Sequence, residues 1–131
     1  MDAGERLVYG ILEAARVVHG TLGPGFIEGI YGRALLVELK NNGFHVDREK
    51  LIKIWYGRSL VGRHRLDLLV DQSIIIELKA NRGIIPVHLA QMISYLHATG
   101  YPLGLLLNFG GTELQREIVR SDASGAIKAI K

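Results

Sequence analysis

The chain has 131 residues, 48% hydrophobic and 22% charged, with a formal net charge of +3, and this balance predicts a soluble globular protein with a single domain over residues 1–131. The absence of cysteine excludes a disulfide framework and a thiolate metal site, and no apolar run reaches the roughly 18 residues of a membrane helix. The acidic start lacks the basic residues of a secretory signal, so we expect a cytoplasmic protein without a membrane partner.

The first third of the chain predicts two helices between about residues 5 and 41. Over residues 5–19 the apolar side chains recur at helical spacing, at Leu7, Ile11, Ala15 and Val18. Glycine and proline at residues 20–24 interrupt this pattern. A second helix is expected over residues 28–41. Its apolar stripe is expected to be buried: Ile30, Ala34, Val37 and Leu35.

The middle of the chain predicts three consecutive strands, near residues 45–56, 59–70 and 74–80. Residues 56–59 form a turn between the first two, and the polar triplet at residues 71–73 separates the second from the third. Both apolar runs beside the triplet are rich in leucine and isoleucine. This pattern is typical of a β-hairpin.

The last third predicts a helix and two more strands. Pro86 is suited to open a helix that Gly100 closes. The apolar run at residues 104–109 indicates a strand covered on both faces. We expect residues 114–120 to form a last, peripheral strand and the residues after Ser121 to be loosely held. The predicted fold class is therefore α/β, with a mixed central sheet flanked by helices.

The second predicted hairpin brings charged side chains together. If it is symmetric about Gln72, Asp67 lies opposite Glu77, and alternation puts Glu77 and Lys79 on one face. Two uncompensated carboxylates in such a pair repel each other, which favours a hard, oxygen-preferring cation between them. In the alternative interpretation, Asp67 is a surface residue near a turn, and Glu77 forms a salt bridge with Lys79.

Other polar residues have helical spacing. Glu28 supplies a third acid at the start of the second helix, where an acid also gains from the partial positive charge of the helix end. Tyr31 lies one turn further on and could equally be a tyrosine at the rim of the core. Gln91 and Tyr95 are i, i+4 partners on the helix at about residues 86–99, and they could line a site or form a surface hydrogen-bonded pair.

These motifs together resemble a known family. An acid on an early helix, then Asp, then Glu-x-Lys, then Gln-x-x-x-Tyr resembles the PD-(D/E)XK nuclease superfamily, and in particular its small GxxExxY proteins. The similarity runs from about residue 23 to about residue 120. It includes five stretches in the same order and spacing: GFIEGIY (25–31), DLLV (67–70), ELK (77–79), QMISYL (91–96) and GLLLNFG (104–110).

The resemblance implies a restriction-endonuclease-like core with a catalytic hairpin at about residues 59–80 and a site-lining helix at about residues 86–99. It implies Mg²⁺ as cofactor, with Mn²⁺ as a substitute. The implied ligands are Glu28, Asp67, Glu77 and the Leu78 carbonyl. Lys79 would hold the attacking water or stabilise the charge developing on phosphorus. Gln91 and Tyr95 would complete the catalytic site, and Tyr31 would support it.

The implied activity is hydrolysis of DNA phosphodiester bonds to give a 5′-phosphate and a 3′-hydroxyl. Eight of the 16 Lys and Arg residues fall within residues 48–82, which suits a polyanion, although a solvated basic strand face gives the same pattern. We expect phosphate contacts from four residues: Arg63, Arg65, Arg82 and His88. The remaining histidines, His64 among them, have no metal-ligand spacing and are expected to have surface or packing roles.

Two other functions fit the same motifs. The first is a nuclease-fold protein that binds nucleic acid, or serves as an interaction subunit, with little activity of its own. The second is a homodimer that resolves Holliday-type junctions, because small resolvases of this length use a similar core. Oligomeric state and substrate preference separate them.

Overall fold

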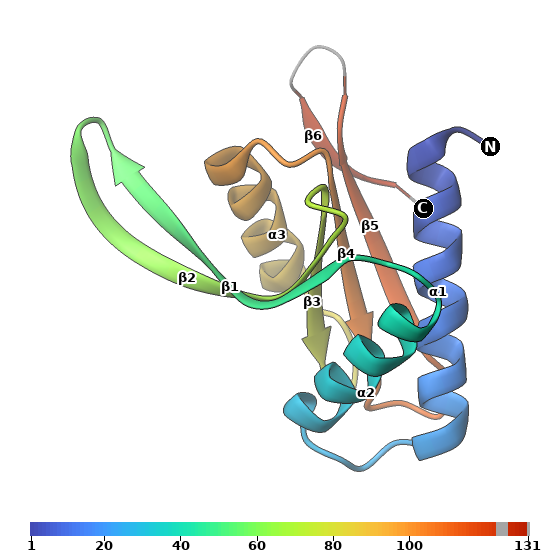
Figure 1. Cartoon of the computed structure of the whole chain (residues 1–131). Helices are drawn as coiled ribbons and strands as arrows, with labels where there is room; N and C mark the ends of the chain where they lie inside the picture. The colour runs from blue at the N-terminus through green and yellow to red at the C-terminus, as the bar shows by residue number, and fades with distance from the viewer. Residues whose placement is uncertain (123–125, 131) are drawn as a thin grey trace.

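The computed structural model describes residues 1–122 and 126–130, and within these the chain forms three helices and six strands (Figure 1). In chain order the elements are α1 (Ala3–Leu22), α2 (Glu28–Asn41), β1 (Val46–Tyr56), β2 (Ser59–Val70), β3 (Ile74–Lys79), α3 (Pro86–Thr99), β4 (Leu103–Asn108), β5 (Gln115–Ser121) and β6 (Ile127–Ile130). No helix in this part of the chain is long and apolar enough to cross a membrane.

The six strands form one mixed sheet in which their spatial order equals their chain order. β3 and β4 are parallel, and every other neighbouring pair is antiparallel. Helix α3 provides the crossover that a parallel pair requires. One apolar cluster lies between the sheet and α1 with α2, and a second lies between the sheet and α3 (Figure 1). The predicted fold class, an α/β fold with a mixed sheet flanked by helices, is confirmed.

Strand β4 forms the centre of both clusters. All six of its residues are buried, as its continuous apolar sequence predicts for a strand covered on both faces. Gly104 on this strand faces Met92 of α3, and a Cβ at Gly104 would collide with the methionine sulfur. The glycine therefore lets α3 pack closely against the sheet, which fixes the distance between this helix and β3 beside it.

The paired part of the β2–β3 hairpin has the predicted register, but the ladder ends at Leu68↔Ile76 and does not include the predicted pair Asp67↔Glu77. Leu68 pairs with Ile76 and Val70 with Ile74, so the ladder is symmetric about Gln72. The turn is closed by the Ser73 N–H, which donates to the Val70 carbonyl at 3.0 Å. Because this register is local and set by a short turn, it was predictable from the polar triplet alone.

The buried stripe of α2 differs from the predicted one. Val37 is 58% exposed and Ile30 and Ala34 are only partly buried, whereas the predicted Leu35 is fully buried and shares the observed stripe with Tyr31 and Leu39. Gly32 belongs to this stripe, and a Cβ there would lie 3.1 Å from Leu78 Cδ1. The helix thus approaches β3 through its glycine, and this close contact selects one of two apolar stripes that the sequence pattern alone does not distinguish.

The end of the chain also differs from the prediction. The strand expected to be last, β5, is followed by β6, which pairs with it from Ile118↔Ile130 to Ser121↔Ile127. The prediction of loosely held residues after Ser121 is therefore wrong for β6. For residues 123–125 and 131 it lies outside the described part of the chain. β6 has four residues and only its isoleucines are large and apolar, which is too weak a pattern to predict a strand.

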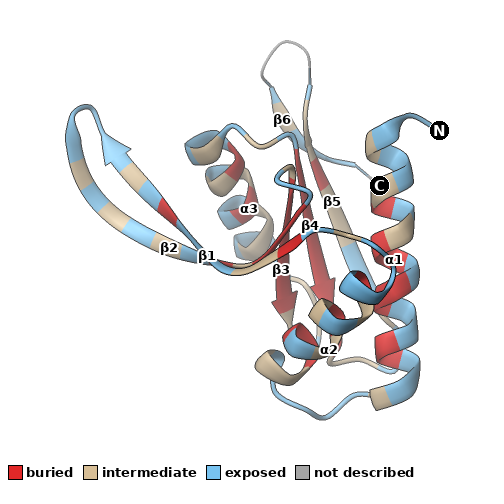
Figure 2. Ribbon diagram, viewed as in Figure 1, coloured by how far each residue is buried: buried red, intermediate tan, exposed pale blue. Residues whose placement is uncertain are grey.

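The hairpin of β1 and β2 extends well beyond the rest of the sheet. Its distal part, residues 50–66, is here named the arm. Figure 1 shows it curving away from the body, and Figure 2 shows that most of its residues are exposed. Its tip is the predicted turn, in which Tyr56 pairs with Ser59. A register shift between Ile54 and Trp55 marks a bulge, a feature that increases the bend and twist of a ribbon.

Candidate active site

Strand β2 changes faces at Asp67. Leu68 packs in the cluster beneath α1 and α2, whereas Leu66 packs in the cluster beneath α3. Residues two apart in a regular strand share a face, so the alternation is interrupted between them. Asp67 is the residue at the interruption. Alternation counted back from Leu69 would place its carboxylate on the α3 side of the sheet, and the interruption removes this constraint.

Strand β1 has a matching irregularity. Glu49 has φ of +56°, in the left-handed region that residues other than glycine seldom adopt. The ladder with β2 pairs Arg48 with Leu68 and Lys50 with Leu66 but omits Glu49 and Asp67. Unusual backbone conformations of this kind concentrate at functional sites. Both strands are thus distorted at the point where the candidate site lies.

The distortion turns Asp67 toward α2. Asp67, Glu28 and Glu49 line a pocket of about 160 Å³, here named the acidic pocket. Its other walls come from α2, β1 and β3: Gly29, Gly32, Arg48 and Leu78. The Leu78 backbone N–H donates to Asp67 Oδ2 at 2.7 Å, and Glu28 is the first residue of α2. The structure therefore brings the predicted residues Glu28, Asp67 and Leu78 together.

A second pocket lies on the α3 side of the sheet. Glu77 and Lys79 share this side, as the alternation of β3 predicts, and they line a space of about 40 Å³, here named the lysine pocket. Its other lining residues come from β2, β4 and α3: His64, His88, Gln91, Met92, Tyr95 and Leu106. Gln91 and Tyr95 thus lie beside Lys79. The predicted site residues are divided between two pockets and do not form one patch.

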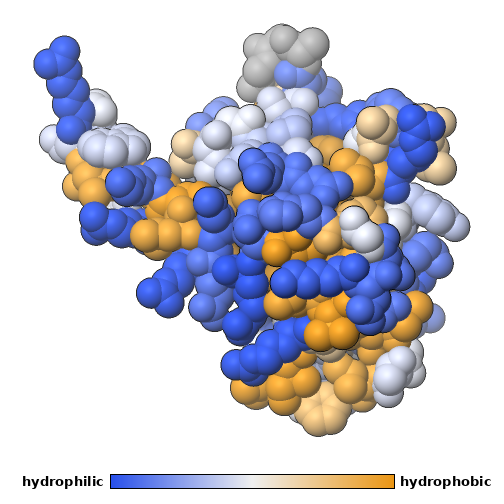
Figure 3. All heavy atoms as spheres, viewed as in Figure 1, coloured by the Kyte–Doolittle hydropathy of each residue, from blue (hydrophilic) through white to orange (hydrophobic). Residues whose placement is uncertain are grey.

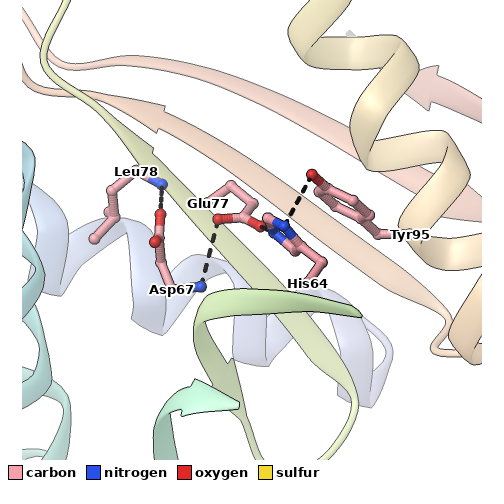
Figure 4. Close-up of polar contacts among 5 residues, drawn as sticks. All are labelled: His64, Asp67, Glu77, Leu78 and Tyr95. Carbon is pink, nitrogen blue, oxygen red and sulfur yellow. Dashed lines mark hydrogen bonds and ion pairs between the residues drawn. The ribbon is translucent and has the colours of Figure 1, made fainter. Parts of the chain in front are cut away.

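A chain of polar contacts connects the two pockets (Figure 4). Glu77 Oε2 accepts from the Asp67 backbone N–H at 3.4 Å, and Glu77 Oε1 lies 2.8 Å from His64 Nε2. His64 Nδ1 lies 3.4 Å from the Tyr95 hydroxyl, and the two rings stack with centroids 4.2 Å apart. This chain fixes the Glu77 carboxyl between β2 and α3.

The titration of this group reflects its surroundings. Burial, followed by the hydrogen bond and charge of Asp67, raises the pKa of Glu77 to about 9. Burial also lowers the pKa of His64 and raises that of Tyr95. These directions favour a neutral carboxyl that donates to His64 Nε2, leaving the His64 Nδ1–H to face the Tyr95 hydroxyl. A nearby positive charge would favour ionisation of Glu77 at neutral pH.

Tyr31 supports the loop before α2. Its side chain is fully buried, and its ring stacks on Phe109 with centroids 4.7 Å apart. Its hydroxyl donates to the Gly23 carbonyl and accepts from the Phe26 N–H. These contacts hold residues 23–26 immediately before Glu28. Tyr31 lines neither pocket, so its contacts are those of a residue that positions the start of α2.

Replacement of Tyr31 by phenylalanine is expected to cost about 1 kcal/mol of stability, because two hydrogen bonds are lost while the stacked ring remains. The DNA cleavage that the sequence motifs predict should fall only modestly, since no atom of the acidic or lysine pocket is removed. Thermal unfolding and cleavage rates measure the two effects. Tyr9→Phe on the exposed face of α1 is the matched control and should change neither. Complete loss of cleavage in a stably folded Tyr31→Phe protein would give the hydroxyl a direct part in the reaction.

The four predicted phosphate contacts lie in three places. Arg63 and Arg65 are exposed on the arm. Arg82 lies in the exposed loop after β3 and lines neither pocket. His88 lines the lysine pocket, and its Nδ1 accepts from the Ile85 N–H at 3.1 Å, which leaves Nε2 as the free ring nitrogen. The four residues therefore do not form one surface, because His88 lies on the α3 side of the sheet and the side chains next to the buried Leu66, among them Arg65, face the other side.

Sequence reasoning missed two residues of the site. His64 was assigned a surface or packing role, yet it bonds Glu77 and stacks on Tyr95. His64 lies three residues before Asp67. In a regular strand the two side chains would point to opposite faces, so a strand with Asp67 on the Glu77 side would turn His64 away from Glu77. His64 lies on the Glu77 side because the alternation of β2 is interrupted at Asp67. Glu49 lines the acidic pocket, and its backbone is in the left-handed region. No pattern of residue types in the sequence predicts this conformation.

The donor chemistry of the site fits a hard divalent cation. The neighbouring Asp67 raises the pKa of Glu77, so the ionised form of Glu77 gains from a cation, and carboxylate oxygens suit Mg²⁺ or Mn²⁺. No three Asp, Glu, His or Cys side chains among residues 1–122 and 126–130 are grouped closely enough to hold a metal ion as they stand. The residues therefore supply donor atoms of the right type for such a cation, but they are not arranged as a complete metal-binding site.

The mixed sheet, its covering helices and the carboxylate–lysine hairpin are those of a restriction-endonuclease-like α/β fold. A family model described as the PD-(D/E)XK nuclease superfamily matches residues 5–121, and the chain belongs to that superfamily.

A structural comparison supports the fold. A solved structure described as "Crystal structure of SSO0001" is similar to this chain with a TM-score of 0.56 and 22% sequence identity. The match covers 70% of this chain and 48% of that chain, so this chain spans about half of that protein. No curated protein matches the sequence.

Proposed function

We propose that the protein is a Mg²⁺-dependent nuclease that hydrolyses phosphodiester bonds of DNA. The observation that carries this proposal is the buried Glu77 carboxyl next to the half-buried Asp67, with Lys79 beside Glu77, in a chain of a nuclease superfamily. A purely structural role does not account for two neighbouring carboxylates, one of them only 7% exposed.

Asp67 and Glu77 would hold the ion, with the Leu78 carbonyl and Glu28 as further ligands. Mg²⁺ is usually bound by one or two carboxylates and retains several waters, which matches this donor set. Mn²⁺ would substitute. When bound, the ion supplies Lewis acidity, which polarises a phosphate oxygen and lowers the pKa of a coordinated water. The acidic pocket provides room beside Asp67 for such waters.

Lys79 is the proposed catalytic cation. It lies on the face of β3 that carries Glu77, so its ammonium can orient the attacking water and stabilise the negative charge that develops on phosphorus. Gln91 would contact the same water or phosphate from α3. Tyr95 acts through His64, whose ring it stacks on, and so positions the Glu77 carboxyl.

The finer assignment follows the sequence motifs. The heptad at residues 25–31 supports membership of the GxxExxY proteins, in which Glu28 and Tyr31 are the defining pair. Tyr31 holds the loop that precedes Glu28, which gives the spacing of the pair a physical reason. We further propose a single domain over residues 1–131, a cytoplasmic location, and a 5′-phosphate with a 3′-hydroxyl as products.

A substrate panel tests this function. Labelled linear duplex, single-stranded and branched DNA are incubated with Mg²⁺, with Mn²⁺ and with EDTA. Cleavage is expected with either metal ion and not with EDTA. Glu77→Gln protein, purified in parallel, serves as the control for a contaminating nuclease.

The other outcomes identify the competing functions. Binding without cleavage of any substrate would indicate a nucleic-acid-binding or interaction subunit. Strong preference for branched DNA, together with a homodimer in solution, would indicate a junction-resolving enzyme.

A further inference from the structure

We propose that the arm binds double-stranded nucleic acid along one cationic face and presents the duplex to the acidic pocket. This inference rests on the proposed function and adds to it the form of the substrate. It is carried by the charge of the arm, the placement of its cations and its dimensions.

The arm carries the excess positive charge of the chain. It contains five of the 16 Lys and Arg residues and none of the 13 Asp and Glu residues: Lys50, Lys53, Arg58, Arg63 and Arg65. The rest of the chain has 11 Lys and Arg against 13 Asp and Glu, so without the arm the charge would be slightly negative. A projecting segment of one charge sign attracts a polyanion and repels no part of it.

Three of these cations lie on one face. Lys53 pairs directly with Arg63, and Arg65 lies two residues nearer to the body. Because Ile52 and Leu66 pack beneath α3, alternation turns the three cations to the opposite side, which is the side of the acidic pocket.

These cations have no acidic partner. All three are exposed, and within the described chain no salt bridge joins any of them to an acidic residue. Like charges directly opposite in a ladder destabilise it. An anion from outside the chain would offset the repulsion within the Lys53–Arg63 pair, and a row of cations suits a row of phosphates.

The dimensions of the arm fit a duplex. Residues 50–56 span roughly 20 Å at about 3.3 Å per residue. A two-stranded β-ribbon enters the major groove, which is about 12 Å wide. The distal part of the arm curves away from the body (Figure 1), whereas Ile52 and Leu66 at its base pack beneath α3, and hydrophilic side chains project along the arm (Figure 3). A ribbon of this length can follow the DNA backbone across one groove, and the acidic pocket then lies next to the duplex at the base of the arm.

The distribution of aromatic residues favours a duplex over a single strand. Single-strand-binding surfaces stack successive bases on aromatic side chains placed along a groove. The arm has only Trp55 and Tyr56, adjacent at its tip and 56% and 81% exposed. None lies among the cations of the row. The row is therefore suited to phosphates, and the tip alone can contact bases.

Fluorescence anisotropy with a short labelled duplex, and with one of its strands, tests the arm. Ca²⁺ replaces Mg²⁺ to suppress cleavage. The Lys53→Ala/Arg63→Ala variant is compared with Arg6→Ala/Arg116→Ala, which removes two exposed cations from α1 and β5. The arm variant should lose on the order of 10-fold or more in duplex affinity at low salt, and its log–log salt slope should fall by about 2. The control should bind nearly as wild type does.

Trp55 provides a second readout, because it is the only tryptophan of the chain. Its emission should change when wild-type protein is saturated with duplex. Circular dichroism verifies that each variant is folded. Equal losses in the arm and control variants, tighter binding of the single strand, or unchanged Trp55 emission at saturation would overturn the inference. A changed oligomeric state in the arm variant would assign the arm to a second copy of the chain.

Failure of the inference is distinguishable from failure of the proposed function. Cleavage that persists while the arm variant binds duplex normally removes only the role of the arm. A wild-type protein that neither binds nor cleaves any nucleic acid refutes the nuclease itself.

Discussion

Lys79→Ala is expected to slow single-turnover cleavage by on the order of 10²-fold or more, because a preorganised charge at the reacting phosphate is lost. Affinity for DNA should remain close to that of wild type, since the proposed role of the lysine is in the transition state and not in substrate binding. Cleavage is measured at saturating protein, and binding is measured in Ca²⁺. The melting temperature should still rise with added metal, because every proposed ligand is intact.

Arg63→Ala and Arg65→Ala provide the comparison for Lys79→Ala. Each should weaken binding and flatten its salt dependence, with a smaller effect on the saturated rate. The opposite result for Lys79→Ala, lost affinity with an unchanged saturated rate, would make this lysine a phosphate contact only. The catalytic centre would then have to be sought among other residues of the lysine pocket.

Glu77→Gln is expected to abolish cleavage while leaving the fold intact. The amide keeps the size of the side chain and can still bond His64, but it cannot provide an anionic ligand. Millimolar Mg²⁺ or Mn²⁺ should raise the melting temperature of the wild type and not that of the variant. Asp67→Ala should abolish cleavage as well, because it removes the other carboxylate of the pair.

The metal-free stability of Glu77→Gln should differ from that of the wild type with pH. The folded pKa of Glu77 is about 9 against an ordinary value of 4.5, so the folded protein holds a proton that the unfolded chain releases. Wild-type stability should therefore fall as pH rises between these values, and the variant should lose less over that range. Urea unfolding in EDTA across this pH range measures the difference.

Glu113→Gln, in the exposed loop before β5, is the matched control for the amide substitution and should behave as wild type does. Cleavage by Glu77→Gln with normal metal dependence would remove Glu77 from the metal site. An equal metal-induced rise in both proteins would mean that the ion binds elsewhere.

The elements that sequence reasoning predicted correctly are those with local determinants. The β2–β3 register follows from a short polar turn between two apolar runs, and α3 from a proline and a glycine at its ends. The burial of β4 follows from its near-continuous apolar sequence, which only Asn108 at its end interrupts with a polar side chain. Each of these depends on neighbouring residues, so a single sequence contains the necessary information.

The features that could not be predicted depend on contacts between distant parts of the chain. The buried stripe of α2 is selected by the approach of Gly32 to Leu78. The division of the site into two pockets depends on the irregularity shared by Glu49 and Asp67, which assigns His64 to the Glu77 side. An alternating pattern assumes a regular strand, and it fails where two strands are distorted together.

The distance between the tip of the arm, at residues 55–60, and the two pockets at its base has a consequence for how the protein can diverge. The register of β1 and β2 is set at the base of their hairpin, where Val46 pairs with Val70 and Arg48 with Leu68. Residue pairs added or removed at the Tyr56–Ser59 end of the hairpin leave the pairs at its base unchanged, and with them the position of Asp67. Related chains can therefore acquire longer, shorter or differently charged arms, and with them new substrates, while the chemical centre stays the same.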